Sequence, residues 1–504
     1  MNGYPDQILK SMNIIIIFNN QYFIDSLQDK EYYQILYYTV WVSVNLEISM
    51  RLTIIMKSKP NHNILKVILY ASGLLSLGVQ AADLGDTPGL NELQSATGRA
   101  VQTVCIGLIP TNEITPNPKT AEQDLFNQCA AMVHTGNEIQ GSGKTGNSLG
   151  LNSAELGSAL QNVATEEMGT PSRVAMGSLS GQVAEINTHL SELHKISQGL
   201  GGGSGDAAGG LLDNRFNVFV NGIGGLGKID GSVRENSTDF YSGGFLVGLD
   251  YRFNEHFVAG LAGAYSHLTA DFQNNINVSG GGIKTDTFNL SLFSSYDIND
   301  FYIDGSFTYG WTNYDVERGV VVLSKNAAST GGANRVAKAD TNGDQFSVGG
   351  GFGYNFHIKA LNLRPYTRFD YYHGQIDAYN ESGAFGLNLS VAEQTFESLQ
   401  SQLGAQLSYV FSPSFGVIIP QINVAWHHEF LNNSRAINAR YSADVNNFTL
   451  TAITDGADRD FATLGVGVSS VLAGGTQLFL NYQTLLGYNR VSSHVLATGV
   501  RLEF

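Results

Sequence analysis

The sequence has few charged residues and almost no cysteine. Charged side chains make up 14% of the 504 residues, and 44 acidic residues outnumber 28 basic ones, which gives a net charge of −16. A protein that binds nucleic acid needs a Lys/Arg-rich stripe to neutralise phosphates, so this acidic balance argues against a nucleic-acid partner. Only two cysteines are present, which excludes the disulfide framework of small secreted domains.

Long hydrophobic runs and prolines are also scarce. The apolar runs within residues 1–49 are shorter than the ~20 residues that a transmembrane helix needs. By contrast, the chain contains 58 Gly, 27 Phe and 23 Tyr, against only 10 Pro. Many glycines and aromatics with few charges suit a sheet that faces lipid. They suit a large soluble all-β protein equally well, so composition alone leaves both classes open.

Residues 50–81 carry the pattern of an export signal. Lysines at positions 57, 59 and 66 precede an apolar stretch over residues 67–79, and Val79 and Ala81 supply small residues at −3 and −1 of a cleavage point. These features are typical of a secretory signal peptide, which normally stands at the start of a chain. We therefore predict a signal peptide over residues 50–81 and treat residues 1–49 as a mis-assigned upstream extension. An unusual N-terminal membrane anchor is the alternative.

Residues 82–171 are expected to form a short helical segment. Helical spacing on both sides of a proline-rich loop at residues 109–118 predicts a helical hairpin. Cys105 and Cys129 lie on its two arms, and in an exported chain such a pair is expected to form a disulfide, because the periplasm oxidises thiols. A zinc site would need two further ligands, which His134 alone does not supply.

A second helix is predicted after Pro171, followed by a linker, over residues 172–212. Its apolar positions recur in alternating steps of three and four, at Met176, Leu179, Val183, Ile186, Leu190 and Leu193. Two interpretations of this stripe stay open. It packs against neighbouring helices in a bundle or coiled coil, or the helix lies inside a barrel as a plug. At about 1.5 Å per residue, residues 172–198 would measure roughly 40 Å, enough to cross a membrane-sized pore.

From residue 213 onward the periodicity changes to two. Twelve strand candidates follow one another, and in the clearest of them one face is made by Phe245, Val247, Leu249, Tyr251 and Phe253. Short turns alternate strictly with longer polar loops, which fall around residues 228–237, 273–282, 319–339, 380–392, 431–457 and 488–492. Outer-membrane barrels sort their connections in this way. We therefore predict an all-β transmembrane fold, a twelve-stranded antiparallel outer-membrane β-barrel over residues 213–504.

Residues 213–504 resemble the C-terminal translocator domain of the type V autotransporters of Gram-negative bacteria. The residues that carry the resemblance are Pro420, Trp426, Glu429 and Phe430 in one strand, the run Leu363-Arg364-Pro365-Tyr366 in another, and Gly499, Leu502 and Phe504 at the end. The resemblance implies a barrel threaded by an α-helix, through which an N-terminal passenger reaches the cell surface.

The same resemblance implies partners. Gly499, Leu502 and Phe504 fit the signal by which barrel-assembly machinery recognises a last strand, although Ala497 stands where that signal usually opens with a polar residue. Export through the Sec translocon, contact with outer-membrane lipid and a monomeric state are expected as well. By alternation, five charged residues should line the lumen, where they could hold the helix, line the path of the passenger or form solvated ion pairs: Asp250, Arg252, Glu429, Arg501 and Glu503.

No enzyme motif stands out, and no cofactor is expected. Gly85-Asp86-Thr87 comes nearest to the Gly-Asp-Ser of a surface esterase, but its Thr lacks a visible His/Asp partner. His427 or His428 could be the histidine of an outer-membrane phospholipase, without a Ser to accompany it. We therefore predict an outer-membrane autotransporter whose barrel translocates or anchors a short passenger that is surface-exposed or periplasmic. The alternatives are a passive porin-like channel plugged by its helical segment, or a barrel-borne lipase or esterase.

Overall fold

The computed structural model divides the chain into two units, Met1–Val79 and Gln80–Phe504. It describes residues 15–23, 34–44, 48–58, 66–71, 83–164, 166–197, 215–273, 280–472 and 476–503. In the first unit, four antiparallel strands pair in chain order: β1 (Ile15–Phe23), β2 (Gln34–Val44), β3 (Ile48–Ser58) and β4 (Lys66–Ala71). The signal peptide predicted over residues 50–81 overlaps β3 and β4, and its cleavage point lies outside the described residues, so it stays a prediction.

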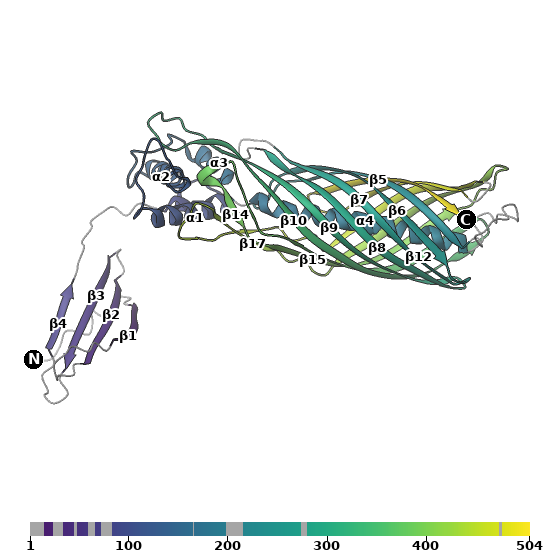
Figure 1. Cartoon of the computed structure of the whole chain (residues 1–504), viewed down its shortest axis with the longest axis horizontal. Helices are drawn as coiled ribbons and strands as arrows, with labels where there is room; N and C mark the ends of the chain where they lie inside the picture. The colour runs from purple at the N-terminus through teal and green to yellow at the C-terminus, as the bar shows by residue number, and fades with distance from the viewer. Residues whose placement is uncertain are drawn as a thin grey trace, which may run out of the picture. The chain divides into compact units, whose positions relative to one another are not determined.

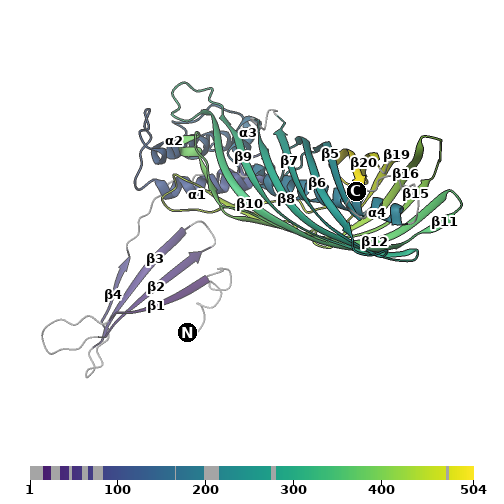
Figure 2. The same ribbon diagram turned by 45° about the vertical axis from the view of Figure 1, so that its right-hand side comes forward.

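The second unit is built on twelve long antiparallel strands that close into a barrel (Figures 1 and 2). Each strand pairs with the barrel strands before and after it, and β21 pairs with β5, for example Leu502 with Val218. A short segment, β11 (Phe356–Ile358), extends the edge of β12 only. The barrel strands are β5 (Phe216–Ile229), β6 (Thr238–Arg252), β7 (Phe257–Phe272), β8 (Gly281–Ile298), β9 (Phe301–Val322), β10 (Ala333–Tyr354), β12 (Leu361–Ile376), β15 (Gln394–Tyr409), β16 (Gly416–Glu429), β19 (Asp460–Leu472), β20 (Gln477–Leu486) and β21 (Val491–Glu503).

Strict alternation of side chains gives this barrel an apolar exterior. On β9, Phe307, Tyr309 and Trp311 point outward and are exposed, whereas Thr308 and Thr312 point inward and are buried. A lipid-facing sheet must satisfy every backbone hydrogen bond internally, which only closure achieves. The predicted transmembrane barrel of twelve strands is therefore confirmed. Among the described residues, none of the helices is both long and apolar enough to span a membrane.

The two ends of the barrel differ in their connections. At one end, which we call the short-turn end, the turns are tight, as at residues 253–256 and 299–300. At the other, the long-loop end, the connections are longer, as at residues 377–393 and 430–459. The loop predicted at residues 319–339 is an exception, because β9 and β10 continue through most of it and leave only residues 323–332 as loop.

β9 and β10 extend through most of the predicted loop because their residues at the long-loop end pack in a hydrophobic core. Val320 and Val322 of β9 and Ala337 and Ala339 of β10 are buried in one hydrophobic core together with helical residues from the start of the unit. Those helical residues lie in η2 (Leu84–Asp86), α1 (Glu92–Leu108), α2 (Ala121–Gln140) and α3 (Ser153–Asn162). We call residues 83–164 the helical cap; they lie at the long-loop end (Figure 1).

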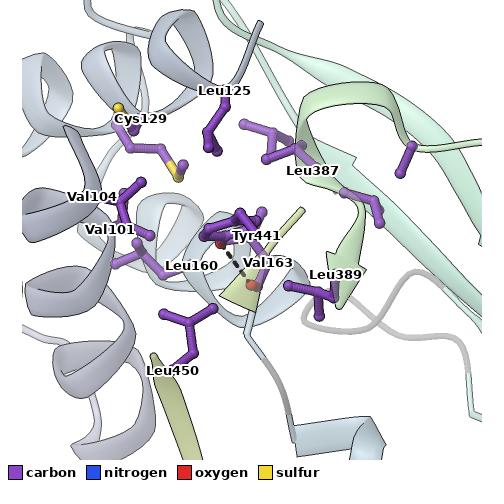
Figure 3. Close-up of a cluster of buried hydrophobic side chains, with 14 of the residues drawn as sticks. Val101, Val104, Leu125, Cys129, Leu160, Val163, Leu387, Leu389, Tyr441 and Leu450 are labelled. Carbon is purple, nitrogen blue, oxygen red and sulfur yellow. Dashed lines mark hydrogen bonds between the residues drawn. The ribbon is translucent and has the colours of Figure 1, made fainter. Parts of the chain in front are cut away.

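The long loops contribute a small sheet of their own, which we call the loop platform. It pairs four short strands in the order β13-β14-β17-β18. Leu387, Leu389 and Tyr441 from this region share the core with Leu125 and Leu160 of the cap (Figure 3). The elements of the platform are β13 (Tyr379–Asn380), η4 (Phe385–Leu387), β14 (Leu389–Val391), β17 (Ala436–Tyr441) and β18 (Leu450–Ile453).

Inside the cap, a buried disulfide joins Cys105 of α1 to Cys129 of α2. Replacing both cysteines with alanine should leave the barrel folded and destabilise the cap by roughly 3 kcal/mol, the loop-closure estimate for a link of this span. Limited proteolysis of the folded protein in detergent measures the effect as faster cleavage between residues 83 and 164. Equal protease resistance of the variant and the parent would contradict the prediction.

Candidate functional site

Helix α4 (Thr170–Ser197) lies in the lumen of the barrel and contacts β7, β8, β9, β10, β12 and β15 (Figure 2). Its apolar stripe packs on lumen side chains: Ile186, Leu190 and Leu193 share a core with Phe219 and Phe293. Nearer the N-terminus of the helix, Leu179 and Val183 pack on Tyr372. Of the two interpretations of this stripe, the helix inside a barrel is the one the structure has, and the helical bundle is wrong.

Buried polar side chains stand beside this stripe on α4. Gln182 Nε2 donates to Ser266 Oγ at 2.7 Å, and His189 Nε2 lies 3.1 Å from Asp250 Oδ2. Glu192 Oε2 accepts a hydrogen bond from Ser469 Oγ at 3.0 Å. These contacts fix the helix in rotation and in height, because turning it would expose its apolar stripe to the polar lumen wall. The remaining face of α4, with Gly177, Ser180 and Gly181, is exposed or half-buried.

The ends of α4 lie at opposite ends of the barrel. Near its N-terminus, Arg173 Nη2 lies 2.8 and 2.7 Å from the carboxylate oxygens of Glu235, in the long loop between β5 and β6. Near its C-terminus, His189 contacts Asp250, two residues before β6 ends at the short-turn end. The helix therefore runs from the long-loop end to the short-turn end, and the cap that precedes it lies at the long-loop end.

Three loops close around the first turn of α4 and form what we call the collar. Besides its pair with Glu235, Arg173 donates to the backbone oxygen of Asp455 at 3.4 Å. Asp455 Oδ2 accepts from Ser232 Oγ and from Arg490 Nη1, each at 2.6 Å. The collar thus links the loop between β5 and β6, the loop before β19 and the loop before β21 to the helix.

The short segment between cap and α4 is held by buried polar groups. Glu167 in η3 (Glu166–Gly169) is 7% exposed, and its Oε1 accepts from Asn236 Nδ2 at 3.1 Å. Burial raises the pKa of Glu167 to about 8; the positive charge of Arg318 opposes this shift, and the negative charge of Glu381 reinforces it. Arg318 itself is buried and pairs with Glu381 at 2.7 Å. Deprotonation of Glu167 is therefore costly, because it would add a second negative charge beside that of Glu381 in a buried environment.

The five charged residues predicted to line the lumen lie in different environments. Asp250 and Arg501 are both buried and lie 3.3 Å apart. Glu429 is buried at the base of a long loop, where its Oε1 accepts from the backbone N–H groups of Leu399 and Leu431. Arg252 is half-buried at the rim of the short-turn end. The side chain of Glu503 lies outside the described residues.

The residues of the family motif occupy defined positions on the barrel wall. Trp426 and Phe430 face outward and are exposed, as is Leu502, and Pro420 also lies on the outward face of β16. Phe504 lies outside the described residues. Gly499 has a packing role, because any Cβ there would collide with the ring of Phe479.

The sequence reasoning missed several lumen groups. Arg368 forms ion pairs with Asp304 at 2.7 Å and with Asp370 at 2.9 Å, and it also donates to Ser306 Oγ at 2.7 Å. Arg364 Nη1 donates to the backbone oxygen of Ser191 in α4 at 2.9 Å. The alternation that pointed to Asp250 also puts the two arginines of β12 on its inward face, so the pattern could have found them.

The candidate hydrolase residues are engaged in structural contacts. Thr87 is buried, and its Oγ1 donates to the backbone oxygen of Leu84 at 2.7 Å. His427 faces the lumen, where its Nε2 lies 2.9 Å from Thr463 Oγ1, while His428 faces outward and lies 2.8 Å from Asp460. Within the described part of the chain, no group of three or more His, Cys, Asp or Glu side chains is placed to hold a metal ion.

One further motif escaped the sequence reasoning. Residues 146–150 have the Gly-x-Ser-x-Gly spacing of a nucleophile elbow. Ser148 is buried, however, and its hydroxyl donates to the carboxylate of Glu138. The nearby His134 accepts from the backbone N–H of Asn147 through Nδ1 at 2.9 Å. The motif lies in a loop and closes a turn beside α2, where it positions the cap against the β9–β10 loop.

Comparison with known proteins shows to which family the barrel belongs. The autotransporter beta-domain model matches residues 218–483, more than half of the chain. An uncharacterised protein from the trpE-trpG intergenic region of Pseudomonas putida is 28% identical over 214 residues, which are 41% of this chain and 33% of that protein. Esterase EstA of Pseudomonas aeruginosa is 26% identical over 196 residues, 38% of this chain and 29% of that protein. The chain thus spans about a third of the length of these relatives.

Solved autotransporter domains also align with this chain. The translocator domain of autotransporter NalP from Neisseria meningitidis aligns with a TM-score of 0.45 and 19% identity, covering 64% of this chain and 98% of that one. The transport unit of AIDA-I from Escherichia coli gives a TM-score of 0.42 and 15% identity, covering 62% and 97%. The family model spans β5 to β20 of the barrel described above. The chain therefore belongs to the autotransporter family, with its β-barrel in the outer membrane of the cell.

Proposed function

We propose that the barrel carries residues 83–164 to the cell surface and holds them there permanently as a folded cap. The observation that carries this proposal is the direction of α4, which enters the lumen at the long-loop end and leaves it at the short-turn end. In outer-membrane barrels the long loops face outside. Residues that precede α4 in the chain are then external once the barrel is assembled.

The contacts of the cap favour retention over release. Asp124 of α2 forms an ion pair with Arg335 of β10, at 2.5 and 2.8 Å. Gln128 binds the backbone of Gly332 in both directions, at 2.8 and 3.2 Å. Tyr441 of the platform donates to the backbone oxygen of Val163 at 3.0 Å (Figure 3). Releasing the cap would expose the hydrophobic core that it shares with the loops, at a cost of about 25 cal/mol for each Å² of apolar surface.

We further propose a structural role without catalysis, metal or cofactor. EstA is an esterase by name, but the hydroxyl groups of Thr87 and Ser148 are buried and engaged here. A porin-like channel is the less favoured alternative, because α4 lies in the lumen with its apolar stripe packed on the wall and Arg173 ties its first turn to the collar. Export through the Sec translocon, insertion by barrel-assembly machinery, a monomeric state and no nucleic-acid partner complete the proposal.

Surface location can be tested by cysteine labelling, since both native cysteines are in a disulfide. In intact cells, a membrane-impermeant maleimide should label Lys119→Cys in the cap. Ser414→Cys, in a turn at the short-turn end, should react only after the outer membrane is permeabilised. Both positions are exposed. Labelling with the reverse pattern would refute the proposed orientation.

Docking of the cap can be tested at Gly386 in η4. A Cβ there would lie 2.6 Å from the backbone oxygen of Ala121 and 2.7 Å from Asp124 Oδ2. Gly386→Ala should therefore weaken docking by about 1–3 kcal/mol, and externally added protease should cleave the cap faster on intact cells. Gly146→Ala is the matched control, because nothing lies within 4 Å of its Cβ. The docking model fails if the two variants are cleaved at the same rate.

The junction at Glu167 should make cap stability depend on pH. The folded-state pKa of about 8 lies above the ordinary 4.5, so the folded protein keeps a proton that the unfolded chain releases. This contribution to stability is complete below pH 4.5 and is lost as the pH rises to 8, at about 1.4 kcal/mol per pH unit. Protease resistance of the cap should fall between pH 5 and pH 8 in the parent protein.

Glu167→Gln should flatten that profile and give the more resistant protein at pH 8. Glu113→Gln, which replaces an exposed carboxylate of the cap, is the control and should keep the slope of the parent. An unchanged slope in Glu167→Gln would show that another group titrates.

A further inference from the structure

A cleft of about 480 Å³ lies at the rim of the short-turn end. It is lined by Arg215 beside the start of β5, by Arg252 at the end of β6 and by the turn residues Phe253, Asn254, Glu255 and His256. This volume falls within the ~300–1,000 Å³ of small-ligand sites. Neither the barrel closure nor the helix α4 accounts for this set of residues.

The floor of the cleft is fixed by backbone hydrogen bonds. The backbone N–H of Arg252 donates to the backbone oxygen of Arg215 at 2.8 Å, which holds the two arginines side by side. Asn254 Oδ1 accepts from the N–H groups of His256 and Phe257, each at 2.8 Å, and so locks the turn. The cleft is therefore preorganised, and a ligand would not need to order it.

Two arginines and one carboxylate line the cleft, so its lining has a net positive charge although the whole protein is strongly acidic. Arg252 is half-buried, and among the described residues its guanidinium has no hydrogen bond or ion pair. Arg215 adds a second permanent positive charge, and His256 adds a ring nitrogen able to donate. Arg guanidinium groups match the oxygens of a phosphate in geometry and charge. Such a set selects an anion with several acceptor oxygens.

The aromatic rings beside the cleft mark the level of the membrane interface. Tyr251, Phe253 and Tyr296 face outward and are exposed. Tyr251 and Phe253 are in edge contact with ring centroids 5.0 Å apart, and His256 lies 6.2 Å from Tyr296. Aromatic girdles sit at the level of lipid headgroups. The arginines are thus at the height where phospholipid phosphates lie.

We propose that this cleft binds the headgroup of an anionic phospholipid from the leaflet at the short-turn end. Arg252 and Arg215 hold the phosphodiester oxygens, and the acyl chains run along the outward face beside Phe253. Glu255 supplies a carboxylate that accepts hydrogen bonds from hydroxyl groups of the headgroup, as phosphatidylglycerol offers. The proposal requires only the barrel in its membrane and does not depend on the surface location of the cap.

Native mass spectrometry of the full chain in detergent tests the site. Phosphatidylglycerol should bind as one retained lipid per chain, more tightly than phosphatidylcholine at the same concentration. Arg252→Gln should weaken phosphatidylglycerol binding by about tenfold, the loss of one charge-assisted contact. Arg459→Gln, which removes an exposed arginine at the long-loop end, is the matched control and should bind like the parent.

Three results would overturn the proposal. They are equal binding of phosphatidylglycerol and phosphatidylcholine, unchanged binding by Arg252→Gln, and complete displacement of the lipid by inorganic phosphate at equal concentration, which would assign the cleft to a free anion. Folding of each variant is checked by heat-modifiable gel migration. Should Arg252→Gln fail that check, His256→Gln replaces it, with a weaker but measurable loss of phosphatidylglycerol expected.

Discussion

The absence of water in the lipid core is the constraint on which the rest of this structure depends. Backbone N–H and C=O groups there must pair with one another, so the sheet has to close, and β21 meets β5 with every residue from Val491 to Glu503 in register. Closure creates a lumen lined by Asn, Gln, Ser and charged residues. Helix α4 occupies part of this lumen, with an apolar stripe and a set of polar side chains that are both buried.

Several glycines of the barrel wall make room for aromatic rings. Rings on the inward face lie against glycines of the neighbouring strand, as Phe219 does against Gly248, Phe293 against Gly260 and Tyr366 against Gly404. A Cβ at any of these glycines would collide with the ring. Ring-over-glycine packing between adjacent strands thus accounts for glycines and aromatics that face inward, whereas the outward aromatics face lipid.

The sequence predicted those features that depend on the local pattern of residues. Alternation with a period of two is visible residue by residue, so the barrel and its outward face were found, and so was the inward position of Asp250 and Arg501. The apolar stripe of α4 was equally visible, but nothing in the stripe says what it touches. Its place in the lumen depends on Phe219, Phe293 and Tyr372, which are distant in sequence and recognisable only once the barrel is closed.

The differences between the predicted and the observed structure arise where the helical cap meets the long loops. Val320, Val322, Ala337 and Ala339 flank a Gly-rich stretch that looks like loop, and they become strand because α2 and α3 cover them. Arg318 is similar: its buried pairing with Glu381 joins a strand to a loop that follows it by 63 residues. Tertiary partners, not local preference, decide the conformation there.

A single hydrophobic core is formed by the helical cap and by loops that emerge from the barrel wall some two hundred residues later, and it makes the two parts one cooperative body. Neither half can be exchanged for that of a relative without replacing the other. Substitutions where cap and loops meet should therefore accumulate in matched pairs during evolution, and a foreign display domain grafted onto this scaffold would have to replace the long loops together with the cap.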